Sequence, residues 1–424
     1  MSVPPENTKI PPCRIKANRI VSLQVSRHKI RIPMSAFARW HFVALLVALP
    51  GLLSSAFAQA PPSPAAPSDP EATRRTRSLF DNLRAVQGRQ VLFGHQDDLA
   101  YGIGWKREAG RSDVQAVCGA YPAVFGWDLG RKMGDSILFN IDTVNFEDMR
   151  QWARKAYQMG GINTFSWHWD NPKTGKDSWD PTPAVADILP GGPLHARLTE
   201  QLDRIAVFFG RLESGGWLRR HKIPIVFRPW HEHTGGWFWW GAQSCTPEEY
   251  RQLYRFTVDY LRREKGLHHL LFAYSPDVFT DEAHYMLNYP GDAYVDIMGL
   301  DYYYRQNNLA QIQTDLPQKL RLVSDMAFRH GKIAAFTETG LESIPAENWW
   351  TQMLLPHLSE SLNPALGSGI SYVLVWRNAR ASHHYAPYPG HQSAADFVSF
   401  SKNTKVLLAG PAVKGMYKRE KRQK

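Results

Sequence analysis

Only three of the 424 residues are cysteines, and the motifs of a zinc enzyme are missing. Cys118 and Cys245 are the two that follow the N-terminal apolar segment. Their wide spacing excludes a zinc ribbon but leaves a disulfide open. The zinc-protease pattern H-E-x-x-H would need a second histidine where the sequence has Gly235. His231 and His233 alternate as in an extended chain, so one helical face cannot present both to a metal. We therefore expect neither a metal nor a cofactor.

Long hydrophobic runs are also missing. The most apolar segment, His41–Leu53, is too short to span a bilayer comfortably. It follows Arg39 and precedes Ala56-Phe57-Ala58, the small-x-small pattern of a signal-peptidase site. We expect residues 1–58 to comprise an upstream extension and a signal peptide that starts at Met34. The mature protein would then be secreted or periplasmic, and an uncleaved signal anchor is the alternative.

Net charge is almost absent outside the two ends of the chain. The formal charge is +11, but residues 1–58 contribute +7 and Lys414–Lys424 contributes +5. Residues 59–413 therefore carry a net charge of −1, which argues against a basic groove for nucleic acid. Residues 59–70, rich in proline, alanine and serine, are predicted to be a linker, and residues 411–424 a solvated basic tail.

Eight short apolar runs recur through residues 71–410, which we expect to form one domain. They are residues 90–94, 123–127, 162–167, 223–227, 269–274, 295–300, 333–337 and 370–376. Segments with a helical pattern, such as 146–159 and 246–265, separate most of them. Near-continuous apolar strands that alternate with helices indicate a parallel sheet that is buried on both faces. Eight such units predict an α/β fold in the form of a single (β/α)8 TIM barrel. The main alternative is a doubly wound open sheet.

Polar and aromatic side chains gather where these runs end. In chain order the ends carry HQDD at 95–98, Asp128, HWDN at 168–171, RPWHE at 228–232, DYY at 301–303, Glu338 and RN at 377–378. A barrel builds its active site from the carboxyl ends of its strands. The 15 tryptophans and 17 tyrosines supply flat faces with polar edges that suit stacking against sugars. We interpret Asp97, Asp98 and Asp128 as structural residues or distal sugar contacts.

Glu232 and Glu338 stand out among these residues. Glu232 follows the fourth run within RPWHEHTGGWFWWG, and Glu338 follows the seventh within IAAFTETG. A buried acid costs free energy unless it is paired or functional. A glycosidase uses two of them, one to protonate the leaving oxygen and one to attack the anomeric carbon. Hydrogen bonds from a tyrosine, a histidine or Arg228 would favour the ionised form of Glu338, whereas the tryptophan-rich loop would raise the pKa of Glu232 by desolvation.

These motifs resemble glycoside hydrolase family 26, the β-mannanase family. Over roughly residues 75–400 the resemblance is carried by LFGHQDDLAYG, FGWDLG, FSWHWDNP, FRPWHEHTGGWFWWG, VDIMGLDYY, TETG and VLVWRNA. It implies a retaining hydrolase that cleaves β-1,4-mannosidic linkages in mannan, glucomannan or galactomannan. It also implies that Glu232 is the acid/base and Glu338 the nucleophile.

The same resemblance implies a set of substrate-binding residues. His231 is similar to the residue beside the acid/base that helps to hold the nucleophile and the sugar 2-hydroxyl. Tyr303 is similar to the tyrosine that hydrogen-bonds the nucleophile, and Tyr302 takes that place if the strand register slips by one. The remaining positions that resemble sugar-binding residues are His168, Trp237, Trp376 and Arg377.

Two other functions remain open. Related members of the family cut mixed-linkage β-glucan or β-1,3-xylan, and a barrel alone does not set specificity. A non-catalytic polysaccharide-binding barrel would use the same aromatic cleft, but such barrels typically lose one carboxylate, and both are present here. The expected partner is a β-mannan-type polysaccharide or oligosaccharide. We expect no nucleic acid, no membrane after signal cleavage, and a monomeric chain.

Overall fold

Eight parallel strands form a closed barrel. They are β1 (Val91–Gln96), β4 (Val124–Asp128), β5 (Ile162–Ser166), β8 (Ile225–Arg228), β9 (Leu270–Tyr274), β10 (Ile297–Asp301), β11 (Ile333–Thr339) and β12 (Ile370–Val375). Each pairs with the next along the chain, and β12 pairs with β1 from Leu92 opposite Tyr372 to His95 opposite Val375. This last pairing closes the sheet, so the predicted barrel is confirmed and the open sheet is wrong. Each of the eight apolar runs contains part of a barrel strand.

The computed structural model describes residues 65–131, 133, 138–277, 279–411 and 413–418. The predicted upstream extension and signal peptide, residues 1–58, lie outside these residues, as does the first half of the predicted linker. Within the described ranges, no helix combines the length and the apolar character that a bilayer crossing requires.

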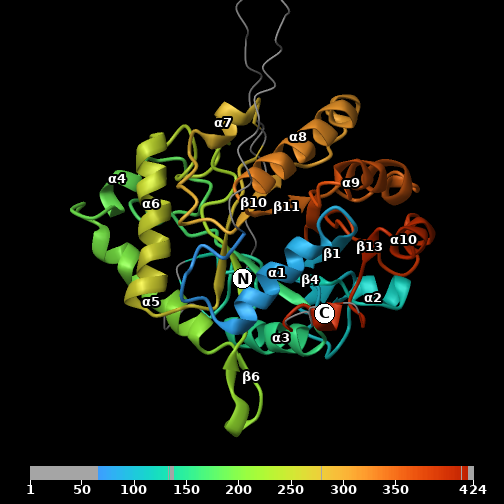
Figure 1. The fold of residues 1–424 in the computed structure, drawn as a ribbon, viewed down its shortest axis with the longest axis horizontal. Helices are drawn as coiled ribbons and strands as arrows, with labels where there is room; N and C mark the ends of the chain where they lie inside the picture. The colour runs from blue at the N-terminus through green and yellow to red at the C-terminus, as the bar shows by residue number, and fades with distance from the viewer. Residues whose placement is uncertain (1–64, 132, 134–137, 278, 412, 419–424) are drawn as a thin grey trace, which may run out of the picture. The chain divides into compact units, whose positions relative to one another are not determined.

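Helices connect the strands and surround the barrel (Figure 1). They are α1 (Arg74–Val86), α2 (Asp113–Cys118), α3 (Phe146–Gln158), α4 (Val185–Ile188), α5 (His195–Gly210), α6 (Pro247–Asp259), α7 (Glu282–Met286), α8 (Leu309–Arg329), α9 (Leu355–Ser361) and α10 (Ala394–Ser401). The sequence explains where some begin. Asn145 caps α3 through its side-chain oxygen, and Thr246 and Glu249 form a reciprocal capping box at α6. The helical segments expected over 146–159 and 246–265 are therefore confirmed.

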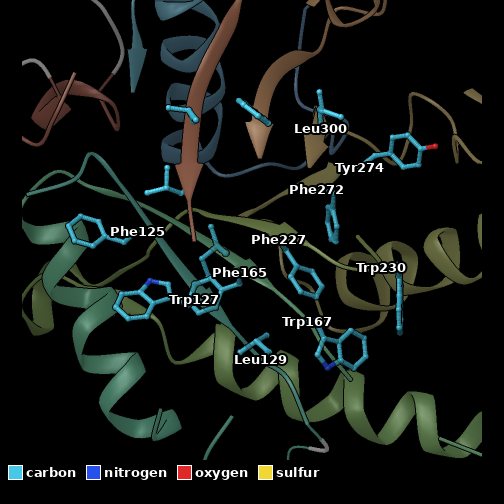
Figure 2. Close-up of a cluster of buried hydrophobic side chains, with 14 of the residues drawn as sticks. Phe125, Trp127, Leu129, Phe165, Trp167, Phe227, Trp230, Phe272, Tyr274 and Leu300 are labelled. Carbon is cyan, nitrogen blue, oxygen red and sulfur yellow. The ribbon is translucent and has the colours of Figure 1, made fainter. Parts of the chain in front are cut away.

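The barrel strands bury both of their faces, because successive side chains point to opposite sides. One set, which includes Phe125, Trp127, Phe165 and Phe227, belongs to the large apolar cluster shared with the helices (Figure 2). The alternate set forms a second cluster to which every barrel strand contributes, and which therefore fills the barrel interior. Two buried faces are the reason why the strands have nearly continuous apolar sequences.

The amino-terminal end of the barrel is closed by α1 together with the C-terminal segment. Val413, Met416 and Tyr417 are buried in the same cluster as the barrel interior. The Asn82 side-chain amide of α1 donates hydrogen bonds to the carbonyls of Met416 at 2.8 Å and of Lys418 at 2.9 Å. The prediction of a solvated tail from residue 411 is therefore wrong for residues 413–418, which complete the barrel floor.

The barrel domain also extends beyond its predicted N-terminal limit at residue 71. The backbone N–H of Ser68 donates to the Asp296 carboxylate at 2.6 Å, and Asp69 is buried and contacts the His268 ring at 2.9 Å. These contacts hold the last residues of the predicted linker against the barrel.

Candidate active site

A cavity of about 700 Å³ opens at the carboxyl ends of the barrel strands. Its walls are formed by residues that directly follow β5, β8, β10 and β12 and by the end of β11. Six of the eight residues predicted from the sequence line it, namely Glu232, Glu338, His168, Trp237, Tyr303 and Trp376. The other two, His231 and Arg377, lie outside its lining.

The loop after β8 turns sharply and places Glu232 in the cavity. Trp230 and Glu232 both have left-handed backbone conformations, with φ of 56° and 52°. For residues other than glycine such conformations cost of order 1–3 kcal/mol and persist only where the surroundings enforce them. Here the Glu232 N–H donates to the Ser275 carbonyl at 2.8 Å, and the Tyr250 hydroxyl donates to the Trp230 carbonyl at 2.8 Å.

The two glycines in HTGGW allow the next part of this loop to fold back over the acid. A Cβ atom on Gly235 would lie 2.3 Å from the Trp237 ring, and one on Gly236 would lie 2.3 Å from the Gln243 side chain. With glycine at both positions, the Trp237 indole N–H reaches Oε2 of Glu232 at 2.9 Å. The conformation of this loop therefore depends on glycine at positions 235 and 236.

Glu338 is held by two donors at the end of β11. Nη2 of Arg228 donates to its Oε2, and the Tyr303 hydroxyl donates to its Oε1 at 2.6 Å. Nη1 of the same guanidinium donates to Asp301 at 2.5 Å, which fixes its orientation. Burial and the charge of Glu338 raise the pKa of Tyr303 well above its usual range, so Tyr303 remains a phenol donor. The hydroxyl of Tyr302 instead donates to Asp315 at 2.9 Å, so Tyr303 is the tyrosine that contacts Glu338.

Glu232 has the opposite environment. Among the residues that the structure describes, no cationic side chain forms an ion pair with it, and its hydrogen-bond donor is the neutral Trp237 indole. Burial, followed by the nearby carboxylates of Glu338 and Asp277, raises the pKa of Glu232 well above its usual range. The surroundings of one carboxyl group of the cavity therefore favour its protonated form, while the other carboxyl group is paired with a guanidinium.

His231 lies behind His168 and is buried. Their Nε2 atoms are 3.1 Å apart, and Nδ1 of His168 is 2.7 Å from the Asp128 carboxylate. The Trp240 indole N–H donates to the backbone carbonyl of His231 at 2.8 Å, which fixes this part of the loop. His231 therefore contacts His168 and does not form part of the cavity wall.

Arg377 lines a smaller neighbouring cavity of about 280 Å³, together with Tyr101, Trp105 and Asp142. Its Nε atom is 2.8 Å from Oδ1 of Asp142. Burial raises the pKa of Asp142 to about 6, although the Arg377 charge opposes the increase. Trp376 lines the larger cavity, so two adjacent residues after β12 line two different cavities.

Sequence reasoning missed several of the residues that line the cavity. Trp179 comes from the loop between β5 and α4 and stacks on His168, with ring centroids 5.3 Å apart. Tyr385 packs edge-on against Tyr303, with ring centroids 5.7 Å apart. The missed lining residues also include Asp277, Arg305, Glu342 and His383. Gly340 of TETG leaves room for Tyr385, because a Cβ atom on Gly340 would lie 2.3 Å from its ring.

The structure also describes the other residues that the sequence singled out. Asp97 accepts a hydrogen bond from the Tyr101 hydroxyl at 2.7 Å, and Asp98 contacts the His95 ring at 2.8 Å. Cys118 and Cys245 are free thiols. Within the described ranges, no cluster of three or more histidine, cysteine, aspartate or glutamate side chains has the arrangement of a metal site.

Comparisons with known proteins agree with this geometry. The sequence profile described as Glycosyl hydrolase family 26 matches residues 68–344. A mannan endo-1,4-beta-mannosidase of Bifidobacterium adolescentis is 37% identical over 366 residues, which is 81% of this chain and 35% of that protein. The chain thus spans about a third of the length of that relative.

Two solved structures are similar over most of the chain. A GH26 beta-mannanase of Bacteroides ovatus is 45% identical, with a TM-score of 0.77, over 82% of this chain and 98% of that chain. A double mutant of a Cellulomonas fimi endo-beta-1,4-mannanase is 36% identical, with a TM-score of 0.75, over 84% of this chain and 80% of that chain. This chain belongs to glycosyl hydrolase family 26.

Proposed function

We propose that this chain is a retaining glycoside hydrolase that cleaves β-1,4-mannosidic linkages in mannan, glucomannan or galactomannan. Glu232 is the general acid/base and Glu338 is the nucleophile. The observation that carries the proposal is the pair of carboxyl groups in one cavity with opposite surroundings. Burial and neighbouring carboxylates raise the pKa of Glu232, whereas Arg228 and Tyr303 hold Glu338. A retaining glycosidase needs one protonated and one ionised carboxyl group beside the scissile bond.

In the first step the protonated Glu232 gives its proton to the glycosidic oxygen while Glu338 attacks the anomeric carbon. The Arg228 and Tyr303 hydrogen bonds hold the Glu338 carboxylate in place before this attack. The ionised Glu232 then removes a proton from a water molecule whose oxygen attacks the anomeric carbon, and the bond between this carbon and Glu338 breaks to release the sugar. Trp179, Trp237 and Trp376 provide faces on which pyranose rings stack along the cavity.

The substrate is inferred from named relatives, so it requires a direct test. We expect galactomannan, glucomannan and mannohexaose to be cleaved, and lichenan and β-1,3-xylan to be left largely intact. Proton NMR of the first products, before mutarotation, should show a new reducing end in the β configuration, because two displacements restore the original stereochemistry. A first product in the α configuration would contradict the retaining assignment. Preferential cleavage of lichenan or β-1,3-xylan would show that the enzyme acts on a different linkage. If no glycan is cleaved, the result would favour a non-catalytic binding protein.

Export is the second part of the proposal. The apolar segment His41–Leu53, followed by Ala56-Phe57-Ala58, supports cleavage by signal peptidase and a secreted or periplasmic enzyme. N-terminal sequencing of the exported protein should find a mature chain that begins near Gln59. A mature chain that retains His41–Leu53 would contradict this proposal and indicate a membrane anchor.

We further propose that the mature enzyme acts as a monomer on a polysaccharide or oligosaccharide of the β-mannan type. Nucleic acid is not a partner in this proposal, because the residues between the two basic ends of the chain carry a net charge near zero.

A further inference from the structure

Asp128 lies at the end of a buried chain of hydrogen bonds that leads to the cavity. Its side chain is fully buried, and its Oδ2 atom is 2.7 Å from His168 Nδ1 and 2.6 Å from the Ser166 hydroxyl. The other oxygen accepts a hydrogen bond from the Gly130 N–H. Burial alone would raise the pKa of Asp128, but His168 and these hydrogen bonds outweigh burial and lower it. Asp128 is therefore an ionised acceptor, and Nδ1 of His168 must carry a hydrogen.

This requirement limits how His168 and His231 can share a proton. Their Nε2 atoms are 3.1 Å apart, and only one hydrogen fits between two nitrogens. In one arrangement a neutral His231 donates to a neutral His168. In the other, a positively charged His168 donates to a neutral His231, whose own hydrogen is then on Nδ1.

The surrounding charges favour the second arrangement. Burial lowers the pKa of His168, but the carboxylates of Asp128, Glu338 and Asp142 outweigh burial and raise it. Burial lowers the pKa of His231 well below its usual range, and the positive charge of Arg228 lowers it further. The shared proton therefore belongs to His168.

We propose that Asp128 is a positioning residue that keeps His168 positively charged beside Glu338, with its Nε2–H directed at His231. This inference rests on the proposed function, because it assumes that Glu338 is the nucleophile. A cationic His168 stabilises the negative charge of Glu338 before the attack on the sugar. It also fixes which nitrogens of the two imidazole rings carry hydrogen. Asp128 does this from inside the barrel wall, without contact with the substrate.

The kinetic test uses Asp128→Asn, which removes the charge and keeps an oxygen that can accept from His168 Nδ1. A 2,4-dinitrophenyl β-mannobioside needs little help from Glu232 to leave, so the burst of dinitrophenol reports the attack by Glu338. In the wild-type enzyme the burst rate should fall at high pH as His168 loses its proton. Asp128→Asn should move this decline to lower pH by about 1–3 units, the shift expected when an adjacent opposite charge is removed. The matched control is Ser166→Ala, which removes a neutral donor to the same oxygen and should leave the decline in place.

A spectroscopic measurement keeps the proposal testable if Asp128→Asn does not fold. Nitrogen-15 NMR of histidine-labelled wild-type protein at pH 7 should show both nitrogens of His168 protonated and the hydrogen of His231 on Nδ1. His168→Gln and His231→Gln spectra would assign the signals. A neutral His168 in the wild-type protein, or an unchanged pH profile in a folded Asp128→Asn variant, would overturn the proposal. If the wild-type protein releases no dinitrophenol, the proposed function fails, while the NMR spectrum still decides the role of Asp128.

Discussion

Replacing Glu338 with alanine should abolish turnover of every β-mannan substrate. The side chain is the nucleophile in the proposed mechanism, so its loss removes the covalent intermediate and not merely part of the binding energy. We expect kcat to fall by a factor on the order of 10⁶, the size of loss found when a hydrolase loses its nucleophile. The measurement is steady-state hydrolysis of galactomannan and of an aryl β-mannobioside. Leaving-group ability should make no difference, because no group remains to attack either substrate.

Azide provides a sharper test of the same assignment. In Glu338→Ala it can occupy the vacated space and attack the anomeric carbon once, which should give a mannosyl azide of inverted, α configuration. The matched control is Glu347→Ala, which changes an exposed glutamate after β11 that lies outside the cavity lining and should retain wild-type kcat. Substantial mannan hydrolysis by Glu338→Ala, or an azide product of β configuration, would show that Glu338 is not the nucleophile.

Replacing Glu232 with alanine should produce a defect that depends on the leaving group. A sugar alcohol needs a proton to leave, so hydrolysis of galactomannan should fall by about 10²–10⁴-fold, the usual contribution of a general acid. A 2,4-dinitrophenyl leaving group needs no proton, so an initial burst should survive in this variant. The covalent intermediate should then accumulate, because no general base activates water for the second step. Stopped-flow detection of dinitrophenol should therefore show a burst followed by very slow turnover.

Azide should restore this second step in Glu232→Ala, because it needs no base, and should give a β-mannosyl azide. Glu248→Ala, at an exposed position in the first turn of α6, is the control and should behave like the wild type. Equal losses on both leaving groups would count against Glu232 as the acid. If azide gave the α product with Glu232→Ala and the β product with Glu338→Ala, the two roles would be exchanged.

The pH dependence of the wild-type enzyme follows from the same environment. Because burial and neighbouring carboxylates raise the pKa of Glu232, the acid form persists to higher pH than for an exposed glutamate. Activity on mannan should therefore be lost as the pH rises through this elevated pKa. In Glu232→Ala the residual activity should not show this loss at high pH.

The barrel could be predicted from the sequence because its physical cause is local. A strand buried on both faces must be apolar along most of its length, so runs such as 162–167 and 333–337 can be recognised without knowledge of their neighbours. The two catalytic candidates could be predicted for a related reason. An acid directly after such a run, as at Glu338, must lie at the mouth of a barrel, where a carboxyl group is costly unless it has a role.

The rest of the site depends on contacts between distant parts of the chain. Trp179 and Tyr385 come from long loops, and nothing in their local sequence indicates that they meet His168 and Tyr303. Arg377 follows a predicted strand, but the position of Asp142 directs it into a second cavity. The position of Arg377 next to Trp376 in the sequence could not reveal that the two side chains line different cavities, because adjacent residues at a strand end point in different directions.

The C-terminal segment shows a different limit of sequence reasoning. Its many lysines and arginines predicted a solvated tail, although the segment also contains a few apolar residues. Val413, Met416 and Tyr417 are apolar anchors only because α1 and the barrel floor lie opposite them. Such a surface exists only after the barrel has formed, so no local pattern could predict it.

The barrel can close only after most of the chain has been synthesised. β1 finds its partner in β12, Gln87 donates to the Gly369 carbonyl 282 positions later, and Asn82 donates to Met416 334 positions later. A ribosome that has reached residue 360 has therefore produced seven of the eight barrel strands but neither the closing strand nor the floor. Such a chain has two open sheet edges, at β1 and β11, which can pair with other chains. Long-range closure of this kind is slow, so we expect the barrel to close only when synthesis is nearly complete. A chain that has not yet closed its barrel would suit the export proposed above.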